Sequence, residues 1–180
     1  MYIFLKIFIL LYMFSNALEA KEPFLATLTN VVSNDIQEFR YANTKFSCLP
    51  YGIIALDEMY RKADEESACK KSIAKFYTKR QDLLYYAQMK LLKLYQRYSI
   101  RIKDKNRCVI NVAGEKTLSE FLIEEGLAVE KPLFKDKEYS YYFYRSEQKA
   151  RVNLKGAWKE KIIKDCVAYI YTQEQLEQMK

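Results

Sequence analysis

Residues 98–128, YSIRIKDKNRCVINVAGEKTLSEFLIEEGLA, decide how this chain is expected to fold. In the first half, apolar and polar residues alternate as in a β-strand. A turn follows at residues 104–106, and a second strand follows the turn. The second half has a helical pattern, in which Thr117 and Glu120 form a capping box and Gly126 ends the last turn. We therefore expect a β-hairpin followed directly by a capped helix.

Three shorter β-prone stretches precede this unit, at residues 25–32, 36–41 and 44–49. Residues 33–35, Ser-Asn-Asp, are a turn signal between the first two stretches, and Pro50 ends the third. With the two strands of the hairpin they make five expected strands.

Helical spacing of apolar residues predicts three further helices. The first pattern runs over residues 53–77 with a polar break in its middle, and the second over residues 83–96. The third covers residues 136–154 and ends at Gly156. The organisation expected is an α+β domain over residues 21–162, with the 53–77 segment as a helical insert and residues 163–180 as a polar tail.

The first twenty residues have the layout of a signal peptide. A lysine near the start precedes an uncharged apolar run over residues 7–14, and small residues follow it. Cleavage after Ala17 fits the small-residue rule better than cleavage after Ala20, and an uncleaved anchor over residues 2–18 is the alternative. Either form places the body in the periplasm or outside the cell, and no second stretch approaches spanning length.

The amino-acid composition limits which catalytic and metal-binding sites the chain can form. The net charge is +7, and the chain has no histidine, which excludes Ser-His-Asp and Cys-His catalysis and histidine-metal sites. The cysteines form no Cys-x-x-Cys pair, so an even count in an exported domain favours two disulfides, with free buried thiols as the alternative. Of the three possible pairings we favour Cys48–Cys69 and Cys108–Cys166, because each joins segments expected to be neighbours.

The order of elements from residue 86 to residue 158 resembles the later half of staphylococcal-nuclease-type (thermonuclease) domains. A helix runs into a strand, and the hairpin has Asn-Arg-Cys where that family has Gly-Arg-Gly. The segment LSEFLIEEGLA is similar to the family's Asn-x-x-Leu-x-x-x-Gly-x-Ala helix, and SEQKAR followed by GAW is similar to its Glu-x-x-Ala-(x)n-Gly-x-Trp ending. The resemblance covers about half of the mature chain and implies an OB-like five-stranded barrel with about three helices.

The chemistry that this resemblance implies is calcium-dependent phosphodiester hydrolysis. It needs carboxylates for a hard cation, a carboxylate to activate water, and arginines to stabilise charge on the phosphate. By position, Asp35 matches the family's early turn aspartate and Arg107 its hairpin arginine. Arg107 as a solvated hairpin side chain, or one paired with a carboxylate, is the structural alternative.

The family's central cluster, Arg-x-x-x-x-Asp-x-Pro-Glu, is missing. Ser47 stands at the expected arginine and Gly52 at the expected aspartate. Asp57 and Glu58 lie slightly downstream as a shifted carboxylate pair. The active site is therefore expected to be degenerate, with the helical insert in place of the active-site loop.

Three functions remain open. The first is a non-catalytic binding or structural part of a cell-envelope assembly, for example a flagellar-motor or secretion accessory part, with a protein partner and no cofactor. Tyrosines in the 139–144 segment are candidate contacts for it. The second is a secreted or periplasmic nuclease using calcium with Asp35, Asp57, Glu58 and Arg107. The third is a non-catalytic binder of nucleic acid or anionic polymer, through basic residues that are densest at Lys79, Arg80, Lys90, Lys93, Arg97, Arg101, Lys103 and Lys105.

Overall fold

A computed structural model describes residues 22–166 and 169–170 of the chain. The leader therefore lies outside the described residues, as does most of the tail. The elements, in chain order, are β1 (Phe24–Ser33), β2 (Ile36–Tyr41), β3 (Thr44–Pro50), β4 (Ile53–Ala55), α2 (Leu56–Lys62), α3 (Ala68–Lys79), α4 (Gln81–Leu84), the π-helical turn η1 (Ala87–Leu91), β5 (Arg97–Asp104), β6 (Arg107–Ala113), β7 (Lys116–Thr117), α5 (Leu118–Glu124), β8 (Ala128–Glu130), α6 (Lys137–Val152) and the 3₁₀ turn η2 (Gly156–Trp158).

Five strands close into a barrel. The sheet order is β3-β2-β1-β5-β6, and a short parallel pairing of β3 with β6 joins its two ends. At this seam the backbone N–H of Leu49 donates to the Asn106 carbonyl at 2.7 Å, and that of Tyr51 donates to the Cys108 carbonyl at 3.0 Å. The expected α+β, OB-like barrel is confirmed, with β4 and β8 forming a separate two-stranded pair.

Both disulfides form, but the expected pairing is wrong. Cys48 bonds to Cys108, and Cys69 bonds to Cys166. The expectation paired cysteines from segments that were expected to be neighbours, whereas barrel closure brings the end of β3 against the start of β6. The first bond therefore staples the barrel seam, and the second ties α3 to the helical residues 162–166.

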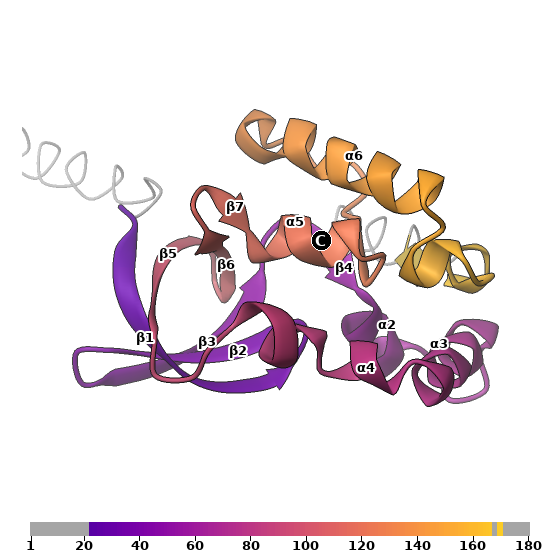
Figure 1. The fold of residues 1–180 in the computed structure, drawn as a ribbon, viewed down its shortest axis with the longest axis horizontal. Coiled ribbons are helices and arrows are strands. Elements are labelled where there is room, and N and C mark those ends of the chain that lie inside the picture. Colours follow the sequence, from indigo (N-terminus) through magenta and orange to yellow (C-terminus); the bar gives the residue numbers. More distant parts are fainter. Residues whose placement is uncertain (1–21, 167–168, 171–180) are drawn as a thin grey trace, which may run out of the picture.

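The capped helix α5 lies between the barrel and α6 (Figure 1). The capping box is present as expected, with the Glu120 carboxylate accepting from the Thr117 N–H at 2.8 Å. After α5 the chain crosses the start of η2 so closely that a Cβ on Gly126 would lie 2.2 Å from the Lys155 carbonyl oxygen. Gly126 and Gly156 also have positive φ, so both glycines are required where the two segments meet.

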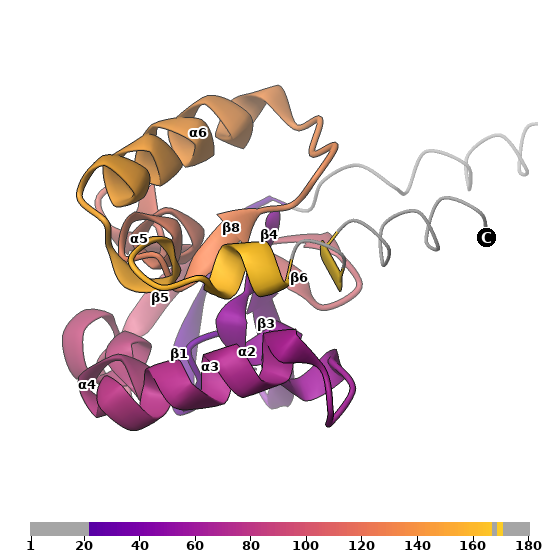
Figure 2. The ribbon, with the colours of Figure 1, turned by 90° about the vertical axis from the view of Figure 1, so that its right-hand side faces the viewer.

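The described helices lie on different sides of the body (Figure 2). Figure 2 shows α6 and α3 at opposite sides of the body, with the helical residues 162–166 between them. The predicted insert over residues 53–77 consists of β4, α2 and α3, and its polar middle is the break between the two helices. None of the described helices is long and apolar enough to cross a membrane.

The helix predicted over residues 83–96 is instead split into α4 and η1, and the reason is a buried asparagine in the β1–β2 turn. The Asn34 side-chain amide donates to the carbonyls of Leu83 and Leu84 at 2.9 and 3.2 Å. Its oxygen accepts the backbone N–H of Ala87 at 2.8 Å. These bonds replace the helical ladder at this point, so a tertiary contact overrides the local helical pattern.

Removing either disulfide should destabilise the fold. Cys48 and Cys108 are 60 residues apart, and closing loops of this length typically stabilises a protein by about 2–4 kcal/mol. Non-reducing peptide mapping should recover Cys48–Cys108 and Cys69–Cys166, and the variant Cys48→Ala/Cys108→Ala should lose about that free energy in urea titrations. Recovery of Cys48–Cys69 would contradict the barrel seam described above.

The contact between β8 and α6 predicts an unusual pH dependence. Burial, together with the nearby Glu147 carboxylate, raises the pKa of Glu130 to about 7. The folded protein then holds a proton that the unfolded chain releases at lower pH, so this residue's contribution to stability falls as pH rises from about 4.5 to 7. We expect Glu130→Gln to raise Tm at pH 8 and to leave it unchanged at pH 4. Equal shifts at both pH values, or a similar gain from the exposed control Glu115→Gln, would contradict this assignment.

Candidate functional site

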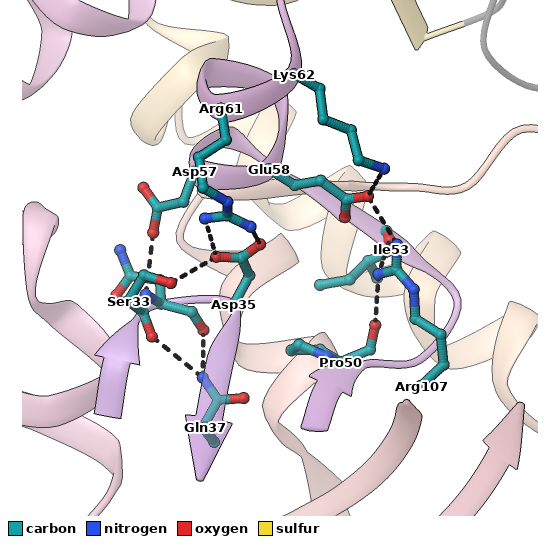
Figure 3. Close-up of polar contacts among 11 residues, drawn as sticks. Ser33, Asp35, Gln37, Pro50, Ile53, Asp57, Glu58, Arg61, Lys62 and Arg107 are labelled. Carbon is teal, nitrogen blue, oxygen red and sulfur yellow. Dashed lines mark hydrogen bonds and ion pairs between the residues drawn. The ribbon is translucent and has the colours of Figure 1, made fainter. Parts of the chain in front are cut away.

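The β1–β2 turn and the first turns of α2 face each other beside the barrel seam (Figure 3). Asp35, from the turn, is 1% exposed and is held by Arg61 of α2 in a two-bond pair of 3.0 and 2.6 Å. Ser33 donates a third hydrogen bond to the same carboxylate at 2.8 Å. Both oxygens of the Asp35 carboxylate therefore have donors from the protein itself.

A second ion pair lies on the seam side of α2. Arg107, in the first position of β6, and Lys62 both donate to Glu58 Oε1 at 2.7 Å. Arg107 also reaches the carbonyls of Pro50 and Ile53, each at 3.4 Å. Burial opposes ionisation of Glu58, but Arg107 and Lys62 together outweigh it and lower the pKa of this carboxyl.

Asp57 differs from the other two carboxylates. It accepts the backbone N–H of Asn34 at 3.0 Å, and it has no ion pair with any residue in the described part of the chain. Burial is the main reason that its pKa is raised, and the Asp35 carboxylate adds to that effect. Burial also raises the pKa of the neighbouring Tyr77 phenol, and the Asp57 charge raises it further.

The fold brings all four predicted site residues together. Asp35 and Arg107 come from the turn and the hairpin, and Asp57 and Glu58 come from α2. The alternative for Arg107 in which it pairs with a carboxylate is the one found. Sequence reasoning missed Arg61 and Lys62, although their spacing four residues after Asp57 and Glu58 on a helix is a signal for carboxylate pairing.

Calcium, which the resemblance implies, does not fit this donor set. Calcium takes six to eight oxygen ligands, mostly from carboxylates and carbonyls. Here Arg61 occupies both oxygens of Asp35, while Arg107 and Lys62 share one oxygen of Glu58. Among the described residues, no three acidic or cysteine side chains gather in a way that could hold a metal ion. Asp35 and Glu58 are already paired with cations of the protein, and Asp57 alone supplies too few oxygen ligands for calcium.

Of the two positions that lack the family's residues, the structure explains Gly52. Ser47 is exposed on β3. Gly52 has a φ of +77°, and a Cβ there would lie 2.6 Å from atoms of both Phe134 and Phe143. Aromatic packing therefore leaves no room for an aspartate at this position.

Half of the basic residues that suggested nucleic-acid binding are paired with acids. Arg101 bonds Glu138 at 2.8 Å, and Lys103 bonds Asp136 at 3.2 Å and Glu138 at 3.3 Å. Arg80 pairs with Asp82, and Lys79 lies 3.8 Å from Glu160. The positive charge of this segment is therefore compensated at these four residues, whereas Lys90, Lys93, Arg97 and Lys105 have no ion pair with a described residue.

A scan against protein-family models and a search of the curated proteins find no match to this chain. The nuclease-type resemblance consequently rests on the motifs in the sequence, and the fold agrees with it only at the level of an OB-like barrel with helices.

The Asp35–Arg61 pair should be tested by removing one partner. Arg61→Ala leaves a buried carboxylate with the Ser33 hydroxyl but no counter-charge, and we expect a loss of about 1–3 kcal/mol, because Arg61 itself is partly exposed. Asp35→Asn/Arg61→Ala should recover part of the loss. The control Arg80→Ala breaks an exposed pair and should change Tm little. Equal effects of Arg61→Ala and Arg80→Ala in urea titrations would refute a buried-charge role for the pair.

Proposed function

We propose that this protein is an exported, non-catalytic relative of nuclease-type barrels that serves as a structural or protein-binding part of a cell-envelope assembly. The observation that carries the proposal is the network of ion pairs among Asp35, Glu58, Arg61, Lys62 and Arg107. Hydrolysis would need free carboxylates for a metal and a base, together with an arginine free to meet a phosphate. Here these groups bond to one another.

An extracytoplasmic location is supported by two disulfides that connect distant parts of the fold. Such bonds persist in oxidising compartments and are rare in the cytosol. The start of the sequence, which is similar to a signal peptide, also supports export. The leader and the two disulfides are therefore consistent with the same location.

A binding role is supported by the outer face of α6. Tyr139 and Phe143 are buried against the body, whereas Tyr141, Tyr142 and Tyr144 are between 52% and 60% exposed. Tyrosine is enriched in protein interfaces because it combines a large apolar ring with a hydrogen-bonding end. The three exposed rings are therefore the contact surface that we assign to a protein partner.

The absence of hydrolysis is directly testable. We expect the purified protein, incubated with Ca²⁺, Mg²⁺ or Mn²⁺ and either DNA or RNA, to show no metal-dependent cleavage, because the Asp35 and Glu58 carboxylates are held in ion pairs. Gel electrophoresis of the nucleic acid provides the measurement, with a thermonuclease as positive control. Metal-dependent cleavage that disappears in a folded Arg107→Ala variant would overturn the proposal and establish the nuclease alternative.

Partner binding by α6 is tested by cross-linking in envelope fractions. Tyr141→Ser/Tyr144→Ser should remove the cross-linked species without changing Tm, since both rings are exposed. Tyr95→Asn is the control, because Tyr95 is also highly exposed and asparagine tolerates its positive φ of 64°. Loss of the species in the control alone would place the contact surface elsewhere.

A further inference from the structure

A pocket of about 720 Å³ lies between the end of β1 and the helices α2, α3 and α4. Figure 1 shows these three helices grouped beside the barrel. The residues that carry the argument are Val32, Asp57, Tyr60, Tyr77, Leu84 and Tyr85, all of which line the pocket. It adjoins the cluster described above through Asp57, but the paired carboxylates Asp35 and Glu58 are not among its lining residues.

Asp57 gives this pocket a negative group without a counter-charge. Asp35 is paired with Arg61, and Glu58 with Arg107 and Lys62, whereas Asp57 accepts the Asn34 N–H at 3.0 Å, interacts weakly with the Tyr77 hydroxyl and has no ion pair with a described residue. A buried carboxylate without a cation is unfavourable unless something supplies the missing charge. A cation entering the pocket would supply it.

Tyr77 is a second, independent sign of a ligand. Its side chain is 9% exposed, and its buried hydroxyl has no hydrogen-bond partner among the described residues. Asp57 raises the pKa of this phenol through its charge and through a weak hydrogen-bonding interaction, but no hydrogen bond of standard geometry joins the two side chains. Buried polar groups normally have partners, so two adjacent groups with spare hydrogen-bonding capacity indicate that a ligand group belongs beside them.

The walls favour a ligand with an apolar stem. Val32, Tyr60 and Tyr85 are each at least 40% exposed, and all three border the same pocket. Leu84 lies against the core beside them. Tyrosine faces also attract cations. Arg61 borders the pocket too, but both of its terminal nitrogens bond Asp35, so its charge is already compensated (Figure 3).

We propose that this pocket binds a primary ammonium group on an aliphatic stem, namely a lysine side chain of a partner protein. An ammonium has three donors and can bond the Asp57 carboxylate and the Tyr77 oxygen together, which a quaternary ammonium cannot do. An anionic ligand would be repelled by the negative charge of Asp57. The assignment to a partner's lysine rests on the proposed binding function, whereas the ammonium chemistry rests on the pocket alone.

The test is an NMR titration of the full chain, with both disulfides formed, against Nα-acetyl-lysine N-methylamide. We expect saturable shifts at residues lining the pocket, and no binding by the matched probe whose Nε is acetylated and therefore neutral. Asp57→Asn keeps an acceptor for the Asn34 N–H but removes the charge, and it should weaken binding about tenfold or more. Tyr77→Phe should weaken it severalfold.

Matched controls separate the pocket from general electrostatics. Asp104→Asn removes an exposed carboxylate that does not line this pocket, so it should leave the affinity for lysine unchanged. Equal binding of the neutral probe, or equal weakening by Asp57→Asn and Asp104→Asn, would overturn the proposal. So would tighter binding of acetate than of the lysine probe.

A second ligand identifies the source of the amine. Butylammonium has the same stem and charge without a peptide backbone. Lysine binding at least as tight supports a partner protein, whereas butylammonium binding about tenfold tighter would assign the pocket to a free amine and overturn the partner assignment. Failure of this titration leaves the cross-linking and nuclease results unaffected, so the two proposals fail separately.

Discussion

The parallel contact between β3 and β6 is the constraint on which the rest of this structure depends. It turns an open sheet into a barrel, and the Cys48–Cys108 bond holds it covalently. Arg107 lies in the same short stretch: its backbone pairs with Leu49, and its guanidinium reaches the carbonyls of Pro50 and Ile53 and the carboxylate of Glu58. The same few residues at the seam therefore close the barrel and position the charged cluster.

Local sequence signals predicted the parts of the fold that are governed by neighbouring residues. The 98–112 hairpin, the capping box of Thr117 and Glu120, and the long helix α6 each depend on contacts a few positions apart. The disulfide pairing was not predictable in this way, because Cys48 and Cys108 meet only after the barrel closes. Nor was the split between α4 and η1, because Asn34 reaches it from about fifty residues away.

The candidate site likewise has features that the sequence predicted and features that it did not. Its four predicted residues were chosen by comparing their positions with the nuclease-type pattern, and the turn, the helix and the hairpin that hold them are governed by local structure. The ion pairing of these residues could not be predicted from local structure, because it depends on which cation lies next to each carboxylate in the folded chain. Arg61 could have paired with Asp57 on its own helix, yet it bonds Asp35 in the facing turn, and that choice leaves Asp57 as the carboxylate without a cation.

Ion pairs of this kind suit a structural role better than a catalytic one. A buried pair contributes little net stability compared with apolar packing, but it strongly disfavours any arrangement that separates its partners. Asp35 with Arg61 joins the β1–β2 turn to α2, and Glu58 with Arg107 joins α2 to the seam. The Cys69–Cys166 bond then ties α3, which follows α2, to the helical residues 162–166. The inserted helices are thus fixed at both sides, by charge toward the barrel and by a covalent bond toward the C-terminal segment, so the pocket between α2, α3 and α4 has walls that are held in place before any ligand enters.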